Sequence, residues 1–271
     1  MKKLLALVLT LIMALSFVAC GSKDTDSADK TDETTAASDL AYVTEKGTLV
    51  VGITDFEPMD YKEKGSDEWI GFDADMAKAF AESLGVKAEF VEINWKNKVM
   101  ELNGKTIDCV WNGMTLTDEV TSAMECSNAY CNNQQIVIVP KDKADKYKTV
   151  EACKELKFAV ENGSAGKDMA EENGFKYTEV KDQATALTEV VSGTSDAAII
   201  DSLMAAAMVG EGTGYESLTY TVGLNSEEYG VGFRKGSDLA QKLNDFFTEC
   251  KGNGKMEEVA EKYGVQAALV K

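Results

Sequence analysis

The sequence is dominated by two successive runs of short apolar strands that alternate with amphipathic helices. The first run has predicted strands at 48–54, 86–93 and 106–111, with helices at 71–85 and 96–103 between them. The second has strands at 135–139, 158–161, 176–180 and 197–200, again with helices between them. Such alternation predicts parallel sheets covered by helices on both faces. Two similar α/β lobes fit a chain of 271 residues better than one continuous sheet.

Residues 1–19 have the composition of a secretory signal peptide. Two lysines precede an apolar run, 4–18, that is too short to span a bilayer comfortably, and a small residue then stands before Cys20. A cysteine at this position resembles a bacterial lipobox, in which Cys20 becomes the lipidated, membrane-anchored N-terminus, although Phe17 departs from the usual aliphatic residue. A plain signal peptide with an incidental cysteine is the alternative.

The lipidated cysteine and a flexible tether are expected to occupy residues 20–44. This stretch is mostly Ser, Asp, Thr, Lys, Ala and Glu, which offer little apolar surface to bury. The sequence therefore predicts a folded body anchored by lipid at the extracytoplasmic face of a cell membrane, at the cell surface or in a periplasm.

Charge and cysteine usage exclude several classes of function. The formal charge of -18 argues against nucleic acid as a partner, because phosphate binding needs the opposite sign. The chain has no histidine and no CxxC motif, so neither a metal site nor a cofactor is expected. A bridge between Cys126 and Cys131 is conceivable in an exported protein, but buried free thiols are the preferred interpretation.

The segment 108–120, DCVWNGMTLTDEV, is the first candidate for a binding site. A strand is predicted to end at Asn112-Gly113, and Thr117 then caps a short helix with acids in its first turn. Open α/β sheets bind ligands at such carboxyl ends of strands. An ordinary strand-to-helix connection is the alternative. The residues of this segment predicted to contact the ligand are Trp111, Asn112, Gly113, Met114 and Thr115.

Taken in order, the motifs of the chain resemble those of the amino-acid-type, family 3 solute-binding proteins of ABC importers. The matching pieces include TLVVGITDFEPMDY (48–61), GFDADMAKAFAESLG (71–85), NGMTLT (112–117), QQIVIV (134–139), ENGSAG (161–166), SGTSDAAIID (192–201) and GVGFRKGSDL (230–239). The resemblance covers nearly everything from residue 45 onward. It implies a type II periplasmic-binding-protein fold, in which two lobes, each a mostly parallel sheet flanked by helices, are joined by two hinge crossings.

The resemblance also implies a domain division and a function. Lobe 1 would comprise residues 45–132 and 226–271, and lobe 2 would comprise residues 133–225. The protein would capture an amino acid or a related amine-bearing small molecule between the lobes, as a monomer, and deliver it to the permease subunits of an ABC importer.

By position, the resemblance assigns roles to residues outside the first segment. Phe56 and Trp95 match aromatic residues that enclose the ligand, although each could instead be core. Asp201 matches the acidic partner of the ligand's ammonium group, together with the Gly113 carbonyl and the Thr115 hydroxyl. A helix N-cap is the alternative for Asp201. The backbone N–H groups of Ser164 and Ala165 begin a helix and would bind a carboxylate.

One departure from the family pattern bears on the ligand. Val120 stands where the family has an arginine that pairs with the ligand's carboxylate. Residues 106–140 contain no lysine or arginine that could replace it. Arg234, the single arginine, matches a position away from the pocket. With further acids at Asp55, Glu57 and Asp60, this favours a ligand with an amine or quaternary ammonium group, such as a cationic amine that lacks a carboxylate, or a ligand whose carboxylate is bound only by the Ser164 and Ala165 N–H groups. A substitute donor such as Lys167 would restore amino-acid binding.

Two other classes of function remain open at this stage. The fold also occurs in dehydratases of the cyclohexadienyl type, but the missing arginine and the absence of histidine argue against an enzyme. A surface sensor or adhesin without a transporter is the second alternative. No catalytic residues are therefore assigned.

Overall fold

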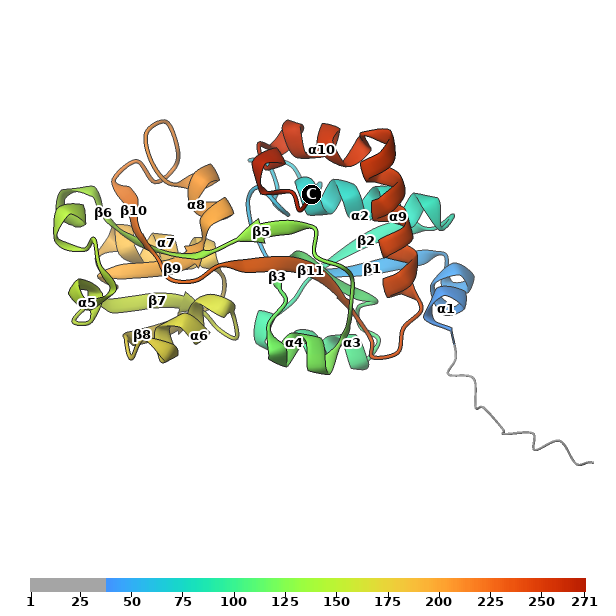
Figure 1. Ribbon diagram of the computed structural model, residues 1–271, viewed down its shortest axis with the longest axis horizontal. Helices are drawn as coiled ribbons and strands as arrows, with labels where there is room; N and C mark the ends of the chain where they lie inside the picture. The colour runs from blue at the N-terminus through green and yellow to red at the C-terminus, as the bar shows by residue number, and fades with distance from the viewer. Residues whose placement is uncertain (1–37) are drawn as a thin grey trace, which may run out of the picture. The chain divides into compact units, whose positions relative to one another are not determined.

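Two mixed β-sheets carry the fold in the computed structural model, which describes residues 38–271 (Figure 1). Sheet 1 has the strand order β2-β1-β3-β11-β4, and β5 also pairs with β11. Its strands are β1 (Thr48–Ile53), β2 (Lys87–Glu92), β3 (Cys109–Thr115), β4 (Glu125–Cys126), β5 (Cys131–Asn133) and β11 (Glu227–Phe233). Sheet 2 has the order β10-β6-β9-β7-β8. Its strands are β6 (Gln135–Pro140), β7 (Lys157–Glu161), β8 (Lys176–Val180), β9 (Ala197–Asp201) and β10 (Leu218–Gly223).

The expectation that each sheet is mostly parallel is confirmed, since one strand runs against the others in each sheet of the described residues, β11 in sheet 1 and β6 in sheet 2. Strands joined by helical crossovers are parallel, namely β1 with β2 and β3, and β7 with β8 and β9. In contrast, β11 runs antiparallel to β3, β4 and β5, and β6 runs antiparallel to β9 and β10. The reversed direction of β6 and β11 follows from their connections. Each strand enters its sheet directly from a strand of the other sheet, without the helical crossover that joins the parallel strands.

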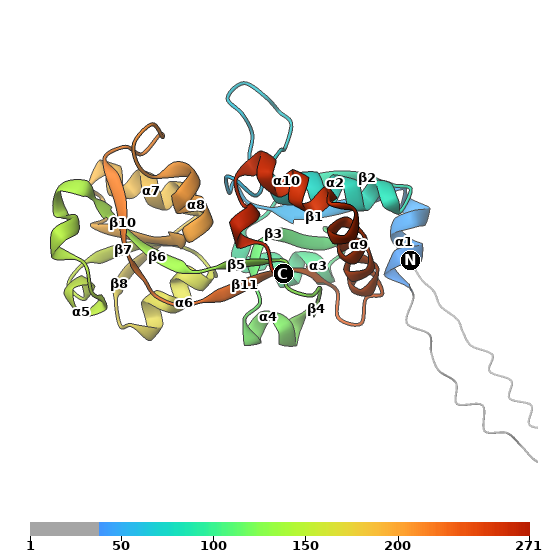
Figure 2. The ribbon, with the colours of Figure 1, turned by 45° about the horizontal axis from the view of Figure 1, so that its top comes forward.

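The chain passes between the two sheets twice, and the two crossing segments lie side by side (Figures 1 and 2). One crossing joins β5 to β6 and the other joins β10 to β11. The crossings are tied together, because the N–H of Leu224 donates to the Gln135 carbonyl at 2.8 Å. We call the part built on sheet 1 lobe 1 and the part built on sheet 2 lobe 2. The predicted boundaries, 45–132 with 226–271 and 133–225, serve as the working division.

Helices cover both sheets, and most begin at a polar capping residue. Lobe 1 carries α1 (Asp39–Lys46), α2 (Phe72–Ser83), η1 (Trp95–Asn97), α3 (Lys98–Asn103), α4 (Asp118–Ala123), α9 (Leu239–Asn253), α10 (Lys255–Tyr263) and η3 (Gln266–Ala268). Lobe 2 carries η2 (Lys141–Lys146), α5 (Val150–Cys153), α6 (Ala165–Glu172), α7 (Gln183–Ser192) and α8 (Ser202–Met208). Thr117, Ser164 and Asp182 each accept a backbone N–H at the start of a helix.

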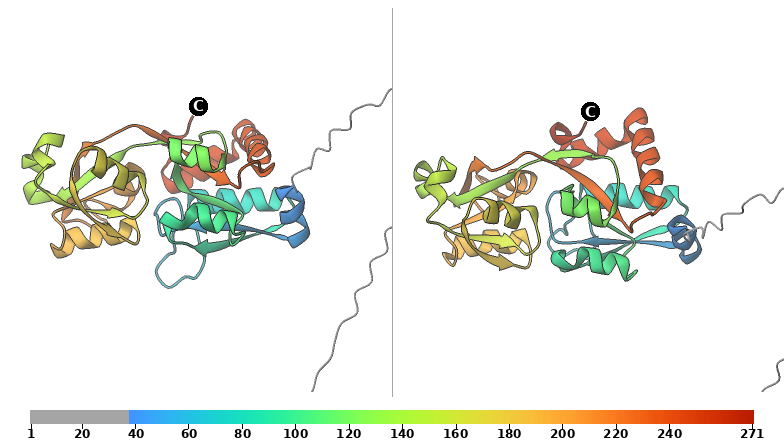
Figure 3. Two further views of the ribbon diagram at one scale, coloured as in Figure 1. Left: turned by 90° about the horizontal axis from the view of Figure 1, so that it is seen from below. Right: turned by 60° about the horizontal axis from the view of Figure 1, so that its bottom comes forward.

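The C-terminal helices return to lobe 1, as the red ribbon in Figure 3 shows. Lys262 and Tyr263 of α10 both donate to the Asp75 carboxylate of α2, each at 2.7 Å. The hydrophobic pattern of these helices identified their apolar faces, but it did not indicate which part of the fold those faces pack against. Within residues 38–271, no helix combines the length and the apolar character needed to cross a membrane.

The prediction of a flexible tether over residues 20–44 is wrong for its last residues, which belong to helix α1. Residues 39–44 are helical, and Ser38 caps the helix by accepting a hydrogen bond from the Ala41 N–H at 3.0 Å. The Nε of Arg234 donates to both carboxylate oxygens of Asp39 at 3.0 Å. These partners are distant in sequence, so local composition could not indicate the helix. The predicted signal peptide and Cys20 lie outside the described residues.

The cysteines of the described part carry free thiols, as the preferred interpretation of the sequence expected. Cys109, Cys131, Cys153 and Cys250 are buried and Cys126 is half-buried. Burial raises the pKa of each of these thiols. They therefore behave as small apolar side chains of the interior.

Candidate ligand-binding site

A cleft between the two lobes lies at the carboxyl ends of β1, β3, β7 and β9. Its walls combine aromatic, hydroxyl, amide and charged side chains from both lobes. From lobe 1 they are Phe56, Trp95, Lys96, Lys98, Val99, Asn112, Gly113, Met114, Thr115, Thr117, Glu119 and Val120. From lobe 2 they are Gln135, Glu161, Gly163, Ser164, Ala165, Asp168, Gln183 and Asp201. Ligand binding at the carboxyl ends of strands is the general behaviour of such sheets.

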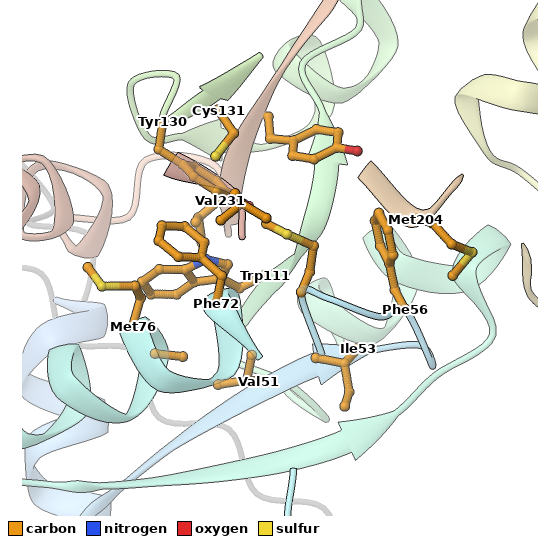
Figure 4. Packing of buried hydrophobic residues seen from close by; sticks show 14 of the residues in the cluster. Val51, Ile53, Phe56, Phe72, Met76, Trp111, Tyr130, Cys131, Met204 and Val231 are labelled. Carbon is orange, nitrogen blue, oxygen red and sulfur yellow. The ribbon is translucent and has the colours of Figure 1, made fainter. Parts of the chain in front are cut away.

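The structure brings the predicted site residues together, with the exception of Trp111. Trp111 is fully buried in lobe 1, with its ring 6.2 Å from that of Phe80 and 5.6 Å from that of Phe247. Figure 4 shows it among Phe72 and Tyr130, with Phe56 further away. Trp111 comes earlier on β3 than the residues that line the cleft, and its ring packs against residues of α2 and α9.

Strand β3 does not end at Asn112-Gly113 as predicted, but continues to Thr115. An irregular register with β11, between Gly230 and Gly232, accommodates the left-handed φ of 55° at Gly113. A Cβ at Gly113 would lie 2.5 Å from Cε1 of Phe56. Glycine is therefore required here because the Phe56 ring lies directly against the strand.

Asn112 positions the loop after β1. Its Oδ1 accepts hydrogen bonds from the N–H and the hydroxyl of Thr54, and its Nδ2 donates to Asp60 Oδ2 at 2.8 Å. Asp60 is fully buried, and neither it nor Asp55 nor Glu57 lines the cleft. The expectation that these acids add negative charge to the binding site is therefore wrong.

Asp201 lies in a dense network with Glu227, a residue that sequence reasoning missed. Its Oδ1 accepts bonds from the Tyr229 hydroxyl at 2.6 Å, from Gln135 Nε2 at 3.0 Å and from Asn133, and its Oδ2 accepts from Gln183. Burial, followed by the nearby charge of Glu227, raises the pKa of Asp201 to about 7. Asp201 stands at the N-cap position of α8, as the alternative interpretation expected, but its side chain makes no capping hydrogen bond to that helix.

Glu227 connects this network to lobe 1. Its Oε1 accepts a hydrogen bond from the Thr115 hydroxyl at 3.0 Å and another from Gln135 Nε2 at 2.8 Å. The predicted ammonium-binding residues Thr115 and Asp201 therefore face a second acid. Glu227 begins β11 just after a crossing, and no local pattern marks it.

The cleft contains a cation, Lys98, that sequence reasoning also missed. Its Nζ donates to the Gly163 carbonyl at 3.0 Å and lies 4.9 Å from the centre of the Trp95 ring. Burial lowers the pKa of Lys98. Val120 lines the cleft as expected, whereas Lys167, the substitute donor considered from sequence, pairs with Glu171 at 2.6 Å and is not in the wall.

The start of α6 offers one backbone donor in place of the two predicted. The Ser164 N–H already donates to the Glu161 carbonyl at 3.2 Å, while its hydroxyl accepts from the Lys167 N–H. The Ala165 N–H has no acceptor within residues 38–271. Because the first N–H groups of a helix have no partner within the helix, Ala165 can donate to an anion in the cleft.

The model of the family described as bacterial extracellular solute-binding proteins, family 3, matches residues 49–266. The chain belongs to this family. The arginine-binding extracellular protein ArtP of Bacillus subtilis is 28% identical, over 97% of this chain and 98% of its own length. The L-cystine-binding protein TcyJ of Escherichia coli is 28% identical, over 83% of this chain and 85% of its own.

Solved structures of similar proteins confirm the predicted two-lobe fold of this family 3 protein. An ancestral amino acid-binding protein, a precursor of cyclohexadienyl dehydratase, is 33% identical with a TM-score of 0.76, covering 83% of this chain and 99% of that one. An ABC uptake transporter substrate-binding protein from Streptococcus pneumoniae with bound histidine is 26% identical with a TM-score of 0.78, covering 87% and 99%. Membership of an extracellular family implies an extracytoplasmic location.

Proposed function

We propose that this family 3 protein captures an amino acid between its lobes and delivers it to the permease of an ABC importer. One observation carries the proposal: the cleft presents an acidic network on one side, and the Lys98 ammonium and the Ala165 N–H, which can donate hydrogen bonds to an anion, on another. An α-amino acid requires both, because its ammonium group needs acceptors and its carboxylate needs donors. The amino-acid ligands named for similar proteins support the same class.

In this proposal the ammonium group binds at Thr115, Asp201 and the Gly113 carbonyl. A carboxylate has about four lone-pair sites. Oδ1 of Asp201 accepts three bonds from the protein, but Oδ2 accepts one, from Gln183, so Oδ2 retains capacity for a ligand. Charge-assisted hydrogen bonds of this kind contribute about 1.5–3 kcal/mol each.

The ligand's carboxylate binds the Ala165 N–H and the Lys98 ammonium. Lys98 thereby supplies the positive charge that Val120 does not. The aromatic rings of Phe56 and Trp95 contact the remainder of the ligand. Lipid attachment at Cys20, a monomeric state and contact with permease subunits belong to the same proposal, and no catalytic role does.

A ligand that carries an amine but no carboxylate is the second candidate. It is favoured by Val120 and by the hydrogen bond that Lys98 already makes to Gly163. A sensor or a dehydratase on the same fold has no observation in its favour beyond the fold itself.

A thermal-shift screen of the purified protein tests the proposal. The panel contains the proteinogenic amino acids, polyamines and quaternary ammonium compounds, since a ligand at 100 times its Kd stabilises by about 2.7 kcal/mol. We expect an α-amino acid to raise Tm and Asp201→Asn to abolish the shift, while Asp245→Asn, at an exposed site on α9, leaves it unchanged. Shifts with amines alone would support the second candidate, and no shift with any member would contradict both.

A further inference from the structure

The carboxyl group of Glu161 is buried in the wall of the cleft without a full set of partners. Glu161 is the last residue of β7, directly before the loop that leads into α6. Its side chain is 3% exposed, and its Oε1 has no hydrogen-bond partner within residues 38–271. A buried polar atom that is left unpaired costs free energy, so an unpaired acceptor in a binding cleft points to a donor on the ligand.

The charged groups around Glu161 do not satisfy it. The ammonium of Lys98 donates to the carbonyl oxygens of Gly163 and Trp95, and no ion pair joins it to Glu161 in the described part of the chain. Burial, followed by the charges of Asp201 and Asp182, raises the pKa of Glu161 to about 8, although the charge of Lys98 and a hydrogen bond with Gln183 act in the opposite direction. A positive charge placed here would offset both the burial and the repulsion.

We infer that Glu161 binds a cationic group on the ligand's side chain, so that the ligand is a basic amino acid. This inference rests on the proposed function, in which Asp201 takes the ammonium group and Lys98 with the Ala165 N–H takes the carboxylate. Glu161 is then the third polar contact. An acidic side chain would meet repulsion here, and an apolar side chain would leave Oε1 of Glu161 without a hydrogen-bond partner.

The charges of the cleft wall agree with this class of ligand. The acids Glu119, Asp168, Glu161 and Asp201 line it, and the cations are Lys96 and Lys98. Lys98 is engaged with a carbonyl of the opposite lobe. A neutral zwitterion would leave this excess of negative charge unchanged, whereas a guanidinium or a second ammonium group reduces it.

Isothermal titration of the purified protein with L-arginine, L-lysine and L-glutamine tests the inference. Glu161→Gln keeps the size of the side chain and removes its charge. We expect wild type to prefer the basic amino acids, and the substitution to weaken their binding about 10- to 100-fold while glutamine changes less than about 3-fold. Glu249→Gln, at an exposed site on α9, is the matched control and should change neither.

The outcomes separate this inference from the proposed function. If a neutral amino acid binds most tightly, and its binding requires Asp201 but not Glu161, the inference is wrong and the proposed function stands. If no amino acid binds, the proposed function fails. A second variant, Glu161→Asp, retains the charge and should keep the preference for basic ligands, and a thermal melt of both variants verifies that each is folded.

Discussion

The ammonium of Lys98 in lobe 1 donates a hydrogen bond to the carbonyl oxygen of Gly163 in lobe 2, with Nζ and O 3.0 Å apart. The backbones also meet here, since a Cβ on Gly163 would lie 2.8 Å from Cα of Lys96. An ion pair between Lys181 and Glu92 joins the lobes as well. The two lobes therefore contact each other beside the cleft.

Replacing Lys98 by methionine should weaken both this contact and ligand binding. The variant Lys98→Met removes the bond to Gly163 and the charge proposed for the ligand's carboxylate. We expect amino-acid affinity to fall about 10-fold or more, measured by titration, and the radius of gyration of the liganded protein to rise in small-angle scattering. Lys176→Met, which removes an exposed pair within lobe 2, is the control. An unchanged affinity would rule out a role for Lys98 in binding.

Gly113 should tolerate no side chain, because two constraints coincide there. A Cβ would lie 2.5 Å from the Phe56 ring and 3.1 Å from that of Tyr229, and φ is 55°. We expect Gly113→Ala to lower stability by about 1–3 kcal/mol and to weaken ligand binding by displacing Phe56. Gly85→Ala has a φ of 73° but open space, so it should cost only about 1 kcal/mol and leave binding intact. Equal effects in the two variants would contradict the packing argument.

The stability of the unliganded protein should fall as the pH rises from about 5 to 8. The pKa values of Glu161 and Asp201 are raised from their ordinary 4.5 and 3.8 to about 8 and about 7, mainly by burial. At a pH between the ordinary pKa and the raised pKa of each group, the carboxyl is ionised in the unfolded chain but still protonated in the folded chain. Each group therefore lowers the free energy of unfolding by up to about 1.4 kcal/mol per pH unit.

Thermal melts across this range measure the effect, with Glu161→Gln as the comparison. The variant should lose the contribution of Glu161 and show a shallower decline, while the decline due to Asp201 remains. Parallel curves for the two proteins would show that the pKa of Glu161 is not raised. Binding of a cation at Glu161 should also release a proton, so affinity should increase with pH up to about 8.

Arg234 should be important for stability and irrelevant to the ligand. Its Nε donates to Asp39, its Nη1 to the carbonyls of Leu102 and Ile107, and its Nη2 lies 3.4 Å from Asp108. Breaking a buried ion pair by removing one partner costs about 3–5 kcal/mol, which we expect for Arg234→Met in denaturant unfolding. Lys242→Met, at an exposed site, is the control. A change in ligand affinity would show that lobe 1 transmits the defect to the cleft.

The parts of the fold that depend on local pattern could be predicted from the sequence. Apolar runs ended by polar residues identified β1, β3, β7 and β9, and polar residues at their ends, such as Asp201, were recognised as site candidates. Trp111 is the predicted ligand contact that the structure places in the core instead of the cleft. Its ring packs against Phe80 and Phe247, which are distant in sequence, so the pattern of β3 alone could not indicate this.

Features that depend on contacts between distant segments could not be predicted. Glu227 meets Thr115 across 112 positions of sequence. Lys98 is the first residue of a short helix, where a lysine ordinarily faces solvent, and its position in the cleft depends on the approach of lobe 2. The unpaired state of Glu161 likewise depends on what surrounds it in three dimensions.

Helix α1 connects the N-terminal side of the chain to lobe 1, and its contacts determine which part of the fold would bear tension applied there. Asp39 is held by Arg234, and the Ser38 hydroxyl donates to Asp238 Oδ2 at 2.5 Å, both in the segment that follows β11. A pull on the chain ahead of Ser38 therefore acts on lobe 1 through an ion pair and side-chain hydrogen bonds. The segments that cross to lobe 2 take no part in these contacts, so a rotation of lobe 2 about them would leave the contacts of Ser38 and Asp39 unchanged.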